Sequence, residues 1–202
     1  MTSLRSRLST TTCAVLAAAF AVSGCSSGPD AAGTVDSMTA FGLEIAKAKD
    51  SIDNTVAALR AVVASQPDVI NANVAAYAKT VSALDAHAKV VRGRAEEMTA
   101  KGDLFFQDWE ALANVGPERR AGLTASYAKI KADMTAAREE FTPFLASLKD
   151  IDSYLKVDPS PTGISTMAEL VRQARVTGAS VKTRIDAVLV QVNSVRGMLS
   201  TK

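Results

Sequence analysis

Residues 70–112 read INANVAAYAKTVSALDAHAKVVRGRAEEMTAKGDLFFQDWEAL. Apolar or small residues recur along this stretch at steps that alternate between four and three, without a break. Such a row is the a/d seam of a helix that packs lengthwise against other helices. The row consists of Ile70, Val74, Tyr77, Val81, Leu84, Ala88, Val91, Ala95, Met98, Gly102, Phe105, Trp109 and Leu112.

Seams of the same kind predict three more helices. They run through residues 34–64, 117–155 and 164–199, while the helix that carries the first seam is expected over 69–115. Short connections make successive helices antiparallel neighbours. The sequence therefore predicts an all-α fold, an elongated antiparallel bundle of about four long heptad-patterned helices over residues 34–202. Each helix is expected to be roughly 45–70 Å long, at about 1.5 Å per residue.

Two residues interrupt the regular pattern. Gly102 lies on the seam, where the missing side chain leaves room for a large neighbour. Pro143 lies inside the third helix and removes one backbone donor, so we expect a kink or a local break there.

The N-terminal residues 1–24 have the features of a secretory signal. Arg5 and Arg7 precede an apolar run, and Val22-Ser23-Gly24-Cys25 has the shape of a bacterial lipoprotein cleavage box. We expect cleavage before Cys25, lipidation of its thiol, and a flexible tether over residues 25–33. The alternative is an ordinary signal peptide cut nearby, which would leave Cys25 as a free thiol.

Charge and cysteine content exclude several classes of protein. Without Arg5 and Arg7 the chain keeps 21 basic and 21 acidic residues, so it lacks the basic field of a nucleic-acid binder. Cys13 would be lost with the signal, which leaves Cys25 as the only cysteine and excludes an internal disulfide. The bundle is thus expected to be held together by burial alone.

The sequence predicts neither a catalytic residue nor a metal site or cofactor. His87 is the only histidine, whereas a di-iron bundle needs histidines from two helices. We expect His87 to lie partly exposed at the edge of the seam. The adjacent acids Glu96-Glu97 and Glu139-Glu140 point about 100° apart on a helix, which is typical of a solvated face and not of an acid/base pair. The sequence also has no nucleophile elbow, P-loop or dinucleotide fingerprint, so we expect no enzyme.

An aromatic cluster at residues 104–109 is open to two interpretations. Phe105 and Trp109 lie on the seam, which favours packing in the core. Phe106 lies one residue off the seam and is expected to be more exposed. With Arg119 and Arg120 at the same end of the bundle, it is a candidate patch for a partner or a membrane surface.

Four segments of the chain carry a family resemblance. Phe105-Phe106-Gln107-Asp108-Trp109-Glu110 is followed by residues 117–120, by Pro143-Phe144-Leu145 and by Tyr154-Leu155-Lys156. This order resembles an uncharacterised domain-of-unknown-function family of bacterial helical lipoproteins with a Phe-x-x-Trp-Glu-like segment. The resemblance covers residues 95–156 and implies a lipobox followed by long amphipathic helices. The sequence departs from the family at residues 157–160, where relatives tend to have an Asn-rich stretch.

Two functions follow as hypotheses. The first is a non-enzymatic, lipid-anchored cell-envelope protein that acts as a helical scaffold, spacer or protein-interaction module. Its expected partners are another protein and the membrane that holds its lipid anchor, and no nucleic acid is expected to bind. The alternative is a bundle that binds an apolar small ligand in an Ala/Gly-lined core, with Gly102, Gly178, Ala88 and Ala174 as lining residues. A pocket of a few hundred Å³ would favour the alternative. In a Gram-negative cell, Ser26 favours the outer membrane, facing the periplasm.

Overall fold

The computed structural model describes residues 30–111 and 116–200. The expected signal peptide, Cys25 and most of the expected tether lie outside the described residues. The described residues form five helices: α1 (Ala31–Val63), α2 (Ile70–Glu110), α3 (Pro117–Val157), the short α4 (Pro161–Thr166) and α5 (Ala168–Ser200). The prediction of an all-α fold is confirmed, since no strand occurs in the part of the chain that the structure describes.

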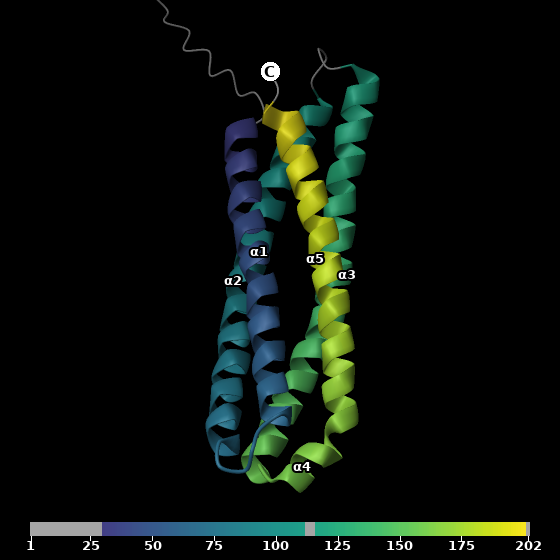
Figure 1. The fold of residues 1–202 in the computed structure, drawn as a ribbon. Helices are drawn as coiled ribbons and strands as arrows, with labels where there is room; N and C mark the ends of the chain where they lie inside the picture. Colours follow the sequence, from purple (N-terminus) through teal and green to yellow (C-terminus); the bar gives the residue numbers. More distant parts are fainter. Residues whose placement is uncertain (1–29, 112–115, 201–202) are drawn as a thin grey trace, which may run out of the picture.

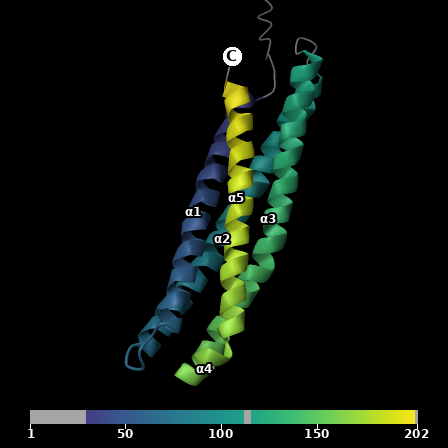
Figure 2. The same ribbon diagram turned by 45° about the vertical axis from the view of Figure 1, so that its right-hand side comes forward.

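The four long helices lie side by side as an antiparallel bundle (Figures 1 and 2). Around the bundle the order is α1, α2, α3 and α5, because α1 contacts α2 and α5 while α3 contacts α2 and α5. The start of α1 and the end of α5 lie at the same end, and α4 lies at the opposite end (Figure 1). The bundle therefore consists of two hairpins, α1/α2 and α3/α5.

The helix ends differ from the expected ones by a few residues. Helix α1 begins at Ala31, because the side chain of Asp30 caps it by accepting a hydrogen bond from the Gly33 amide at 2.9 Å. The last three residues assigned to the tether are thus helical. The fourth helix is divided in two at Met167, and its first piece, α4, is capped by the Ser160 hydroxyl.

Helix α3 runs through Pro143 as one helix, so the expected local break does not occur. A proline inside a helix costs about 3 kcal/mol, and only tertiary packing offsets a cost of that size. The residues that follow Pro143 supply such packing, because Phe144, Leu148 and Ile151 are all buried.

The predicted seams form the core of the bundle. The apolar spacing of the first helix predicts two rows, Met38, Ile45, Ile52 and Leu59, and Phe41, Ala48, Thr55 and Val62, and every residue of both is buried. The predicted row from Val171 to Val195 on α5 is buried as well. The α2 seam is buried from Ile70 to Leu84 and from Met98 to Phe105, and the α3 seam from Leu123 to Ile130 and from Phe144 to Leu155, whereas the middle of each seam is not buried. Burial of these apolar side chains is the main favourable term in the stability of the bundle.

Gly102 makes room for a large side chain, as predicted. A Cβ atom at residue 102 would lie 2.4 Å from the hydroxyl oxygen of Tyr127, so only glycine fits there. The ring of Tyr127 stacks on Phe106 with centroids 4.3 Å apart. The close approach of α2 and α3 at this end of the bundle depends on the glycine.

No helix in residues 30–111 and 116–200 is both long and apolar enough to cross a bilayer.

Candidate functional site: a cleft between α2 and α3

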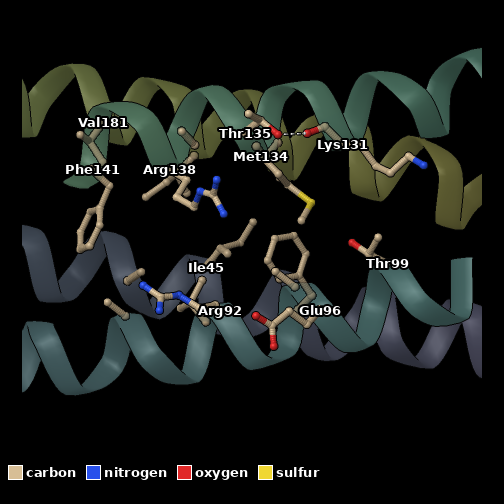
Figure 3. A pocket seen from close by; sticks show the side chains of 18 of the residues that line it. Ile45, Arg92, Glu96, Thr99, Lys131, Met134, Thr135, Arg138, Phe141 and Val181 are labelled. Atoms are coloured by element: carbon tan, nitrogen blue, oxygen red, sulfur yellow. Dashed lines mark hydrogen bonds between the residues drawn. The ribbon is translucent and has the colours of Figure 1, made fainter. Parts of the chain in front are cut away.

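The unburied middle sections of the α2 and α3 seams face each other. On α2 no residue between Leu84 and Met98 is buried, and on α3 none between Ile130 and Phe144 is buried; the structure describes both stretches completely. Between them lies a cleft of about 610 Å³ (Figure 3). We call it the α2/α3 cleft. Its volume lies within the range of about 300–1,000 Å³ that is usual for small-molecule sites.

Apolar side chains from all four long helices line the cleft. Helix α2 contributes Leu84, Val91 and several alanines, and α3 contributes larger residues together with Ala137. Helices α1 and α5 form its floor, so the cleft opens the core of the bundle to one side. Its apolar lining consists of Leu84, Ala88, Val91, Ala95, Ala100, Met134, Ala137 and Phe141 on the walls, and Phe41, Ile45, Ala48, Val181, Ile185 and Val188 on the floor.

Beyond one end of the cleft, a tyrosine from α2 bridges the two helices. The hydroxyl of Tyr77 donates a hydrogen bond to the backbone oxygen of Leu148 on α3, at 2.9 Å. A second contact joins the two helices nearby, because the Lys149 ammonium on α3 lies 2.7 Å from the Asp85 carboxylate on α2. Burial raises the pKa of Tyr77, and the charge of Asp152 adds to the effect, so the phenol stays a donor.

The other end is closed by a tyrosine from α3. The hydroxyl oxygen of Tyr127 lies 3.0 Å from the Thr99 backbone oxygen and 2.9 Å from Oδ1 of Asp103. Lys131 also contacts Asp103, at 2.9 Å. Burial raises the pKa of Tyr127, and by itself it would raise that of Asp103. The hydrogen bonds from Lys131 and Tyr127 nevertheless hold the pKa of Asp103 below its usual value.

The size of the seam residues explains why a cleft forms between these two ends. Tyr77 and Tyr127 bridge α2 and α3 at both ends and fix the distance between the helices. Ala88, Ala95 and Ala137 lie between them and have too few atoms to fill that distance. Two helices pack closely only where their side chains reach across the gap between them. These alanines do not reach across, so the space between α2 and α3 stays open.

Charged residues surround the mouth of the cleft. Arg92 and Glu96 lie on α2, and Arg138 and Lys131 lie on α3 (Figure 3). Lys131 is paired with Asp103. Among the described residues, no carboxylate lies within salt-bridge distance of Arg92 or Arg138, and both side chains are exposed. The mouth thus has two guanidinium groups, one on each wall, that are available to a ligand.

His87 lies at one end of the cleft and is partly exposed, as expected. Its Nε2 atom lies 3.1 Å from the Glu44 carboxylate and its Nδ1 atom lies 3.1 Å from the Ser51 hydroxyl, both on α1. The imidazole therefore links α2 to α1. In the part of the chain that the structure describes, no three His, Cys, Asp or Glu side chains come together as a metal site.

The expected surface patch does not form, because Phe106 is buried. Only 5% of its surface is exposed, and its ring is covered by Tyr127. Arg119 is exposed, with Nη2 3.5 Å from the Met198 backbone oxygen, and Arg120 is half-buried. The prediction that Phe106 is the exposed member of the aromatic cluster is wrong. The helical register places it against α3, and Leu104 is the exposed residue instead.

Of the four residues expected to line a pocket, only Ala88 does so. The ring of Tyr127 occupies the space beside Gly102, and the ring of Phe144 occupies the space beside Gly178. Ala174 is buried in the core. The sequence does carry a signal for the cleft. The α2 seam has only Ala88, Val91 and Ala95 between Leu84 and Met98, but this run of small residues predicts a site only once its partner on α3 is known.

No protein-family model, curated protein or solved structure matches this chain. The resemblance to a family of helical lipoproteins therefore remains a prediction, and the function is inferred from the site itself.

Proposed function

We propose that this protein is a non-enzymatic, lipid-anchored binding protein of the cell envelope that holds an apolar ligand in the α2/α3 cleft. The observation that carries the proposal is the cleft itself, about 610 Å³ with an apolar lining, in the middle of a bundle whose described seam residues are otherwise buried except Trp109 and Leu199 near the helix ends. A scaffold or spacer needs only a filled core. An open cleft costs stability, and the ligand would recover that stability by covering the apolar walls.

Filling the cleft is expected to abolish binding. We expect Ala95→Phe to weaken the uptake of N-phenyl-1-naphthylamine, a neutral probe that fluoresces in apolar surroundings, by about tenfold or more, equal to about 1.4 kcal/mol. The new ring would occupy the space that the probe needs. Ala83→Phe is the matched control, because Ala83 is exposed on the same helix and does not line the cleft.

The titration is best done with the full chain carrying Cys25→Ser, which cannot be lipidated. Any probe taken up by the apolar residues 13–22 is then the same in all variants. Thermal melting of each variant monitors the fold. Equal probe affinity in the parent chain and in Ala95→Phe, with melting unchanged, would reject the cleft as a binding site.

The anchor is proposed separately, on the basis of the Val22-Ser23-Gly24-Cys25 box. Mass spectrometry of the protein from its own membranes is expected to find a mature N-terminus at Cys25 that carries a lipid. Cys25→Ala should release the protein from the membrane fraction or leave the signal uncut. A mature chain that begins at another residue would contradict the anchor and leave the cleft proposal untouched.

A further inference from the structure

We infer that the ligand of the α2/α3 cleft is a single-chain anionic amphiphile, a long-chain fatty acid being the simplest, with its carboxylate held between Arg92 and Arg138. The inference rests on the proposed function. It adds the chemical class of the ligand and the orientation in which it binds.

The charges at the mouth support an anionic group at one place in the cleft. Arg92 on α2 and Arg138 on α3 line the same section of the cleft from opposite walls (Figure 3). Neither forms a salt bridge within the described part of the chain, whereas Lys131, the other cation of the cleft, is paired with Asp103. The planar guanidinium group binds a carboxylate through two parallel hydrogen bonds, so two such groups form a strong site for one anion.

Among the described residues that line the cleft, Glu96 is the one acid without a salt bridge, and it lies one turn along α2 from Arg92. It offsets part of the positive charge but leaves an excess of one. A neutral ligand would leave that excess without a counterion, and an anion would neutralise it. Charge complementarity therefore favours an anionic headgroup over a neutral one.

The dimensions of the cleft fit one acyl chain. Asp103, where the Tyr127 contact closes the cleft, lies eleven positions after Arg92 on α2, and at about 1.5 Å per residue this is a distance of about 16 Å. An acyl chain that spans one leaflet of a bilayer is about 15 Å long, half of the hydrocarbon thickness. From a carboxylate at Arg92 and Arg138, the chain would run along Ala95 and Met134 toward Thr99.

The test compares two ligands that differ only in the headgroup, dodecanoate and dodecanol, by displacement of N-phenyl-1-naphthylamine from the full chain carrying Cys25→Ser. In the parent chain we expect dodecanoate to bind about tenfold more tightly than dodecanol. In the double variant Arg92→Gln/Arg138→Gln this preference should disappear, with the affinity for dodecanol unchanged.

A second double variant controls for net charge. Arg60→Gln/Arg175→Gln removes two other exposed arginines, on α1 and α5, and should keep the preference for dodecanoate. Equal affinity for the acid and the alcohol in the parent chain would overturn the inference, as would a preference that survives Arg92→Gln/Arg138→Gln. In both cases displacement of the probe by dodecanol would still support the cleft. If neither ligand displaces the probe, and Ala95→Phe does not reduce its uptake, the proposed function itself fails.

Discussion

Ile130→Ala is expected to lower the free energy of unfolding by about 2–5 kcal/mol, the range measured for truncating fully buried aliphatic residues. Ile130 is completely buried in the α3 seam, next to the point where Tyr127 closes the cleft. Urea unfolding monitored by circular dichroism measures the loss.

The matched variant is Met134→Ala, four residues further along the same seam. Met134 is half-buried and borders the open cleft, so its truncation enlarges an existing space and creates no new cavity. We expect a loss of about 1 kcal/mol, in proportion to the smaller apolar area that Met134 buries. Equal losses at the two positions would show that the cleft is closed in solution. Lys131→Ala, at the exposed residue between them, should stay within about 1 kcal/mol despite its pair with Asp103.

Phe106→Ala is expected to destabilise the bundle by about 3–5 kcal/mol, as large aromatic truncations in a core do. The ring of Phe106 is 5% exposed, stacks on Tyr127, and meets Phe105 edge to face at 5.1 Å between centroids. Its loss would leave Tyr127 without support where α3 approaches Gly102. The effect is measured by the same urea titration.

Leu104→Ala is the control for Phe106, because Leu104 lies two residues away on the same helix and is 65% exposed. Its truncation should change the stability by no more than about 0.5 kcal/mol. A small effect of Phe106→Ala, comparable to that of Leu104→Ala, would mean that Phe106 faces solvent and would restore the surface patch expected from the sequence.

The inferred ligand also gives a physical reason for the shape of the bundle. A four-helix bundle gains most stability when all four seams are filled, and here the small residues Ala88, Val91 and Ala95 of the α2 seam lie opposite a section of the α3 seam that is also not buried. The two tyrosine contacts hold the helices apart on both sides of that height. A chain under selection for stability alone would place a larger residue at Ala95 or Ala137, as the cleft-filling variant does.

The sequence by itself determined which residues form helices and which face of each helix is buried. Both follow from the spacing of apolar residues along one segment, a local property, because residues three and four apart lie on one face of a helix. All of the rows on α1 and nearly all of the row on α5 are buried as predicted. The sequence also predicted that Gly102 leaves space for a large side chain, but it did not predict that this side chain is Tyr127.

Only the tertiary structure decided what the seams leave unfilled. Ala88 and Ala95 are ordinary seam residues until α3 places Ala137 and Met134 opposite them, and that pairing depends on the register between two helices joined by a connection outside the described residues. The same register buries Phe106, which lies off its own seam, under a ring from α3. Arg92 and Arg138 are far apart in the sequence and meet at one mouth for the same reason. Heptad spacing specifies which face of a helix is buried. A site between two helices depends on the combined side-chain volume of the two facing surfaces, and no single segment of sequence encodes that sum.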